Sequence, residues 1–203
     1  MDFERQETNS ARLILYAFIR SAFDSPPNQE KFDYWLSLLS SLYGGTGLSE
    51  LDDAIIQLKS ALEQNGLISC QNEYYELFEN PFSSLAIHLY ASYYIDGKIM
   101  GPSLVKLRQL LYNLNIGKVK NFNESEDHLV FLIDLMMFLI QRGNQDSNRS
   151  LKAQKEIIED YLRPIIEGAN RVIKKYDDFL IYKSFFKIAR SFLSLEQCLF
   201  PSG

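Results

Sequence analysis

Residues 129–140 read Leu-Val-Phe-Leu-Ile-Asp-Leu-Met-Met-Phe-Leu-Ile, and this stretch decides the fold. Asp134 is its only polar residue. A helix that crosses a bilayer needs about 20 apolar residues, so this run is too short to span a membrane. We therefore expect it to form a helix that is buried in the core of the protein.

The rest of the chain follows the same helical period outward from this run. Towards the C-terminus, apolar side chains recur at the spacing of one helix face: Tyr182, Phe185, Phe186, Ala189, Phe192 and Leu193. Near the N-terminus, Leu13, Tyr16, Ala17 and Arg20 share a face in the same way. No stretch alternates as a strand does, so the sequence predicts an all-α fold, a single globular domain of about nine or ten helices.

Polar and glycine-containing segments divide these helices. Residues 115–124 form the longest stretch without periodicity, and we interpret them as a hinge between an N-terminal part, 1–114, and a C-terminal part, 125–203. The apolar helix is then expected to begin at Ser125, which places Glu126 and Asp127 in its first turn. A helix is also expected from about Leu85 to Gly97, and Gly66 is expected near the end of another.

The composition limits the location and the partners. The net charge of −5 disfavours nucleic acid, because phosphates would be repelled. Cys70 and Cys198 form neither a disulfide framework nor a Cys-x-x-Cys pair, which favours a reducing compartment. The polar start, MDFERQETNS, lacks the apolar stretch of a secretory signal. We therefore expect a cytoplasmic, soluble protein with no stable membrane insertion.

The residues offer little for catalysis or metal binding. His88 and His128 are the only histidines, and neither belongs to a His-Glu-x-x-His or a Glu-x-x-His motif. The glycines at 44–47 lack the pattern of a phosphate-binding loop. We expect no catalytic residues, no metal and no cofactor. An alternative is a haem-oxygenase-like enzyme with His88 as the ligand, which would show a haem absorbance band.

Three clusters remain as candidate binding features. An aromatic cluster at 74–81 contains Tyr75, Leu77 and Phe78, and it fits either a short core helix or one wall of a peptide groove. The tyrosines at 90, 93 and 94 are equally compatible with core and surface. The segment Glu124-Ser125-Glu126-Asp127-His128 fits either a simple helix start or an acidic binding site.

Several motifs together resemble the TorD–DmsD–NarJ family of chaperones, which mature molybdenum-containing redox enzymes. The family's hallmark resembles Glu-Pro-x-Asp-His before an apolar helix with an internal acid; here Glu124–His128 and Asp134 occupy those places, with Ser125 instead of proline. Similar stretches span nearly the whole chain: Arg12 with Tyr16, Tyr75-x-Leu77-Phe78, Leu104–Leu114 with Arg108 and Tyr112, Leu162-Arg163-Pro164, and Phe185-Phe186.

The resemblance implies a cytoplasmic helical chaperone and not an enzyme. Such proteins bind the twin-arginine signal peptide of a molybdoenzyme catalytic subunit precursor, assist its cofactor loading and hold back its export. The resemblance places Glu124, Glu126 and Asp127 at the basic end of the peptide, with His128, Tyr75, Leu77 and Phe78 lining or shaping the groove. A monomer or a domain-swapped dimer is expected. The alternative is a helical adaptor or regulator that binds a folded partner.

Overall fold

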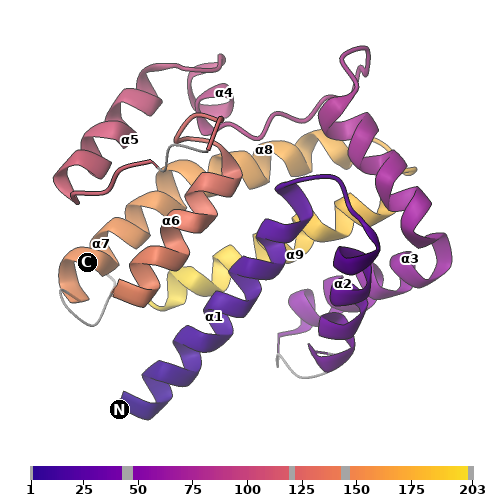
Figure 1. Ribbon diagram of the computed structural model, residues 1–203, viewed down its shortest axis with the longest axis horizontal. Coiled ribbons are helices and arrows are strands. Elements are labelled where there is room, and N and C mark those ends of the chain that lie inside the picture. Colours follow the sequence, from indigo (N-terminus) through magenta and orange to yellow (C-terminus); the bar gives the residue numbers. More distant parts are fainter. Residues whose placement is uncertain (1, 43–47, 119–121, 143–146, 201–203) are drawn as a thin grey trace. The chain divides into compact units, whose positions relative to one another are not determined.

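The computed structural model describes residues 2–42, 48–118, 122–142 and 147–200, and these ranges are largely helical and contain no strand (Figure 1). The prediction of an all-α fold is therefore confirmed. In chain order the helices are α1 (Asp2–Phe23), α2 (Gln29–Leu42), α3 (Ser49–Tyr74), the π-helix η1 (Tyr75–Glu79), α4 (Ala91–Asp96), α5 (Pro102–Asn113), α6 (Leu129–Arg142), α7 (Ser147–Ile157), the π-helix η2 (Ile158–Leu162), α8 (Arg163–Ile173) and α9 (Leu180–Cys198).

The chain forms two compact units, each assembled from segments that are distant in the sequence. Unit 1 comprises Met1–Arg20, Leu89–Ile165 and Phe200–Gly203, and unit 2 comprises Ser21–His88 and Ile166–Leu199. The expected hinge at 115–124 lies wholly inside the Leu89–Ile165 segment of unit 1, and its residues 119–121 fall outside the described ranges. The division into parts 1–114 and 125–203 stays a prediction.

Helix α6 is the core of unit 1, as its sequence predicts. Nine of its side chains are buried, and it packs on α7 and η2, while α4 packs on α5 and η2 (Figure 1). Its single acid, Asp134, accepts hydrogen bonds from the Arg20 guanidinium, with Nε 2.6 Å from Oδ1. Among the described residues, no helix is both long enough and apolar enough to cross a bilayer.

Unit 2 has an aromatic core in which α9 packs on α3 and α3 packs on α2. The ring of Trp35 lies 4.8 Å from that of Phe185, and both side chains are fully buried. The hydroxyl of Tyr182 donates to the carbonyl oxygen of Ala22 at 3.2 Å, which satisfies an acceptor in the last turn of α1. The expected buried face of the last helix is confirmed.

A buried carboxylate fixes the start of α9. Both oxygens of Glu73 accept backbone N–H groups there, from Ile181 at 3.2 Å and Tyr182 at 2.9 Å. These amides have no partner within the helix, so the carboxylate acts as their cap. Burial raises the pKa of Glu73 to about 7, although the two backbone hydrogen bonds oppose the shift.

Two expected helix boundaries are wrong for one shared reason. Residues 80–90 are not helical, so the helix expected from Leu85 begins only at Ala91. The apolar helix begins at Leu129 and not at Ser125. In both places the backbone instead forms an antiparallel bridge between Tyr90 and His128, and a helix would use the same N–H and C=O groups internally.

Gly66 lies at a kink where two helical segments of α3 meet, in agreement with its expected place near the end of a helix. Its φ of 72° and ψ of −179° interrupt α3, which continues to Tyr74. A Cβ built at this position would meet nothing within 4 Å, so glycine is required by the backbone conformation and not by space. The glycine-containing stretch at 44–47 lies outside the described residues.

Candidate functional site

The acidic segment 124–128 is a turn that precedes α6, and backbone pairing within unit 1 holds it in place. The Leu129 amide donates to the Leu89 carbonyl oxygen at 2.7 Å, and the Ala91 amide donates to that of Asp127 at 2.9 Å. The His128 amide closes the turn on the Ser125 carbonyl oxygen at 3.0 Å. The position of the turn therefore depends on residues almost forty positions earlier in the chain.

Asp127 lies at the centre of this arrangement and is fully buried. Its Oδ2 accepts the amide of Ser92 at 3.0 Å and the hydroxyl of Ser92 at 2.5 Å, while its Oδ1 accepts the hydroxyl of Ser125. The Ser92 Oγ in turn accepts the Met100 amide at 3.0 Å. Asp127 therefore ties the turn to the first residues of α4, and its own carboxylate does not reach solvent.

Ser125 replaces the proline of the family motif, and its hydroxyl has a definite partner. The residue is buried, and the hydroxyl donates to Asp127. Proline carries no side-chain donor, so this replacement adds a hydrogen bond to the buried carboxylate.

The two glutamates of the turn lie nearer the surface. Glu126 Oε2 accepts two hydrogen bonds from Arg108 of α5, from Nε at 2.9 Å and from Nη2 at 2.8 Å. Burial tends to raise the pKa of Glu126, but the Arg108 hydrogen bonds, a backbone hydrogen bond and the charges of Arg108 and Lys118 outweigh it and hold the pKa below its usual value. The exposed Glu124 accepts the hydroxyl of Tyr90, and its carbonyl oxygen accepts Lys118 Nζ at 2.8 Å.

Aromatic rings line the turn beside these acids. The His128 ring lies 5.0 Å from that of Tyr90 and 6.2 Å from that of Phe122, which in turn lies 5.7 Å from Phe131. Burial lowers the pKa of His128, although the charges of Glu124 and Asp127 oppose the shift. His128 Nδ1 accepts the Val130 amide at 3.3 Å, which fits a neutral ring. The turn thus combines carboxylates with an uncharged aromatic wall.

The aromatic segment that was predicted to share this site belongs to unit 2. Leu77 is only 1% exposed, and its carbonyl oxygen accepts the Ile87 amide at 2.8 Å. The half-buried Phe78 ring packs 5.1 Å from Tyr74 and 5.2 Å from Tyr182. Tyr75, at 49% exposed, is the most accessible of the three predicted residues. Leu77 is therefore buried and Phe78 packs on rings of unit 2, while the role of the three residues in peptide binding stays a prediction.

The structure also places His88, which the sequence offered as a possible haem ligand. His88 lies in the loop before α4, and burial lowers its pKa. Within the described ranges, no group of three or more His, Cys, Asp or Glu side chains is arranged to hold a metal ion.

Sequence reasoning missed several residues that build the turn. Ser92 and Arg108 contact it from α4 and α5, and Phe122 from the segment before it. Tyr90 had been noted only as one of three tyrosines. A local pattern cannot find these residues, because each contact joins positions that are distant in the sequence or that have no periodicity.

Comparison with known proteins agrees with this architecture. The chain is 24% identical over 202 residues to the chaperone protein TorD of Aliivibrio fischeri and 23% identical to TorD of Aliivibrio salmonicida. Each alignment covers 93% of this chain and 94% of the relative. A crystal structure described as a candidate redox enzyme maturation protein from Archaeoglobus fulgidus superposes with a TM-score of 0.51, at 19% identity, over 92% of this chain and 93% of that one. At that identity the likeness concerns the fold alone.

Two of these relatives are thus named as TorD chaperones, and the fold is shared with a protein described as a candidate redox enzyme maturation protein. The profile of the nitrate reductase delta subunit family matches residues 46–168, more than half of the sequence. The chain belongs to this family, which is the TorD–NarJ family that the sequence motifs indicate.

Proposed function

We propose that this protein is a cytoplasmic chaperone that binds the twin-arginine signal peptide of a molybdoenzyme catalytic subunit precursor. In this role it assists cofactor loading and assembly and delays export until the precursor is complete, without catalysing a reaction. Membership of the family and similarity to the TorD chaperones support the general role. The observation that supports the peptide site is the acidic turn of unit 1, held by the buried Asp127 beside an aromatic wall.

The chemistry of such a peptide matches the turn. Arginine guanidinium groups bind carboxylates through paired, charge-assisted hydrogen bonds, and Glu124 and Glu126 offer carboxylates near the surface. The apolar part of the peptide finds the rings of Tyr90 and Phe122 nearby. Glu126 is already bound by Arg108, so a peptide arginine must share or displace it, whereas the carboxylate of Glu124 receives only the Tyr90 hydroxyl among the described residues.

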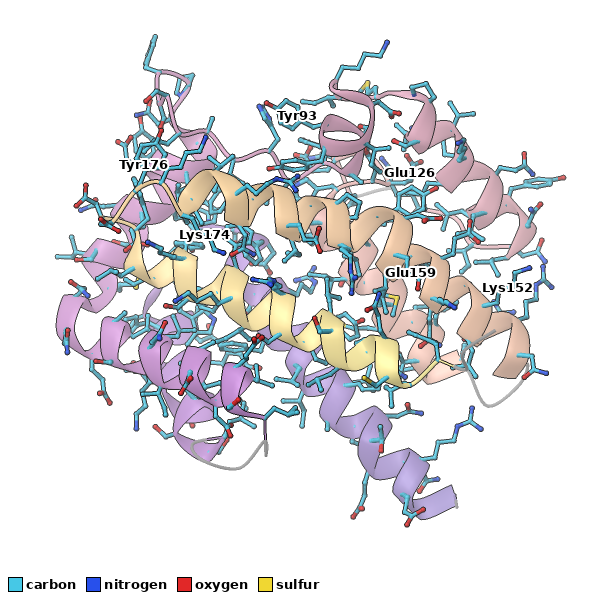
Figure 2. The ribbon with its side chains drawn as sticks, turned by 180° about the vertical axis from the view of Figure 1, so that it is seen from behind. Tyr93, Glu126, Lys152, Glu159, Lys174 and Tyr176 are labelled. Carbon is cyan, nitrogen blue, oxygen red and sulfur yellow. The ribbon has the colours of Figure 1, made fainter. Side chains whose placement is uncertain are left out.

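The direct test is a calorimetric titration of the protein with a synthetic twin-arginine signal peptide. We expect Glu124→Gln to weaken binding by about tenfold, because one charge-assisted pair is lost. Glu126→Gln should have a smaller effect, since Arg108 already neutralises that carboxylate. Glu159→Gln is the matched control, an exposed acid of unit 1 on the helical stretch that also carries Lys152 (Figure 2).

A second titration uses the same peptide with both arginines replaced by glutamine. Binding of this peptide should be weak and insensitive to Glu124→Gln. If the native peptide binds the wild type, Glu124→Gln and Glu159→Gln with equal affinity, the acidic turn is not the site. If no variant or wild-type protein binds any twin-arginine peptide, the proposed function itself is wrong.

A further inference from the structure

A cavity of about 110 Å³ opens in unit 1 where the ends of α5 and α6 meet the start of α7. Three apolar side chains, Leu114, Ile116 and Leu139, and two guanidinium groups, Arg142 and Arg149, line it. None of these residues belongs to the acidic turn. Its lining combines an apolar wall with few polar groups, as the lining of small-molecule sites does.

The wall on the α5 side is held by a defined helix end. Asn115 adopts a φ of 54°, and its amide donates to the Tyr112 carbonyl oxygen at 3.0 Å. The Ile116 amide donates to the Leu111 carbonyl oxygen, also at 3.0 Å. This pair of bonds is the Schellman pattern, in which the left-handed residue is usually glycine and sometimes asparagine. Asn115 and Ile116 are therefore fixed in place by the backbone.

The opposite wall is held by a buried hydrogen-bond chain. The Ser150 hydroxyl donates to the Leu139 carbonyl oxygen at 2.9 Å and accepts Gln154 Nε2 at 3.0 Å. Gln154 Oε1 in turn accepts Arg12 Nη2 at 2.6 Å. Ser150 and Gln154 are both buried, so α6 and α7 are joined firmly at the rim.

The two arginines give the cavity a positive charge. Arg149 donates to the Asn113 carbonyl oxygen, and the Arg142 guanidinium lies 5.8 Å from the Phe138 ring centre. These partners are uncharged, and among the described residues neither arginine forms an ion pair with a carboxylate. Residues 142–155 carry four basic side chains and one acidic one, in a chain whose net charge is −5.

A structural role for Arg149 explains only part of this arrangement. Its hydrogen bond to Asn113 satisfies a carbonyl group at the end of α5, which is a common use of arginine. That bond does not account for the second guanidinium or for the apolar side chains that line the same cavity.

We propose that this cavity binds a small molecule that joins a phosphate or carboxylate group to an apolar body. The guanidinium groups of Arg142 and Arg149 bind the oxygens of the anion through paired hydrogen bonds. Leu114, Ile116 and Leu139 cover the apolar part. Phosphate and carboxylate share this chemistry, and the choice of probes distinguishes them.

The test is a titration of the protein with phenyl phosphate, monitored by NMR chemical shifts. Benzoate tests the carboxylate, inorganic phosphate tests the anion without an apolar body, and phenol tests the body without a charge. We expect phenyl phosphate or benzoate to bind. The probe with the higher affinity then shows whether the cavity prefers a phosphate or a carboxylate group. Binding should weaken as salt is added. Equal binding of phenol, or no binding of either charged probe at millimolar concentration, would overturn the proposal.

Variants locate the site. Arg142→Gln and Arg149→Gln should each weaken binding of the better probe by about tenfold, since each removes one guanidinium fork. Lys152→Gln is the matched control, an exposed cation on α7 that does not line the cavity (Figure 2). Its affinity should stay within about twofold of the wild type, because only screened charge is lost. Equal losses in all three variants would mean nonspecific attraction and overturn the assignment.

Two controls separate the possible failures. The first control is the melting temperature without ligand, which falls if Arg149→Gln merely loosens the end of α5. The second is Arg149→Lys: if this variant restores the affinity for the probe at unchanged stability, Arg149 has a role in binding. Affinity for the twin-arginine peptide is measured in parallel and should be unchanged in Arg149→Gln, so this proposal and the peptide site fail independently.

Discussion

Two segments of this chain combine acids with aromatic rings, but they differ in how deeply they are buried. In 73–79, within unit 2, Leu77 is buried in the core and the acid Glu73 caps a buried helix start. In 124–128, within unit 1, two glutamates lie near the surface and Asp127 holds them from beneath. Each segment is organised by one buried carboxylate. The partners of that carboxylate are the first amides of α9 in one case, and Ser92 of α4 with Ser125 of the turn in the other.

The largest effect is expected from Asp127→Ala. It leaves three buried donors, the amide and hydroxyl of Ser92 and the hydroxyl of Ser125, without their acceptor. The free energy of unfolding should fall on the order of 4 kcal/mol. Urea denaturation measures this, with Asp160→Ala, an exposed acid of unit 1, as the control. A loss no larger than that of the control would mean that Asp127 does not hold the turn.

Leu77→Ala should cost about 3 kcal/mol, because it creates a cavity in the core of unit 2. If the segment were a groove wall, the cost would be small and peptide affinity would fall. Denaturation and peptide titration of the same sample distinguish these outcomes. We expect a large loss of stability and no change in the affinity of the folded fraction.

Glu73 should make stability depend on pH. Its pKa is about 7 in the folded protein and about 4.5 when unperturbed, so the folded state binds the proton more tightly. Its contribution is therefore fully present below pH 4.5 and is lost as the pH rises through 7. The change is at most about 3 kcal/mol. Glu73→Gln should remove this part of the pH dependence, whereas Glu79→Gln, an exposed neighbour, should leave it unchanged.

The smallest effect is expected from Tyr75→Ala. The ring is 49% exposed, so the loss of stability should stay below about 1 kcal/mol. Peptide titration then tests the sequence prediction for this residue directly. A loss of affinity at unchanged stability would confirm that Tyr75 contributes to binding, and unchanged affinity would contradict it.

Much of the helical fold could be predicted because its signals are local. The run at 129–140 and the aromatic face of α9 repeat at the helical period, and burial follows from that repeat. Leu85, His88, Leu89 and Ser92 show similar spacing, yet residues 80–90 form a loop. Their backbone pairs in part with 127–129, and the sequence spacing contains no sign of that partner.

The candidate site was predictable in position but not in the roles of its residues. The acids and His128 stand out against the apolar helix that follows. Which acid is buried depends on Ser92, a residue with no distinguishing local pattern. Leu77 and Phe78 were candidates for a groove wall because an apolar side chain in a core and one in a binding groove have the same sequence signature. The burial of Leu77 and the packing of Phe78 against Tyr74 and Tyr182 are visible only in the structure.

The bridge between Tyr90 and His128 has a consequence for how the protein opens. It pairs residues 89–91 with residues 127–129 and so closes the stretch between them, which contains α5 and most of α4 and of the acidic turn, into an excursion with a neck. Two backbone bonds and the Asp127 carboxylate form that neck. Hydrogen exchange in the excursion should therefore respond as one cooperative block when the neck is weakened. A ligand bound at the turn would slow hydrogen exchange throughout that block. Its binding would therefore also lower the exchange rate of amides in α5.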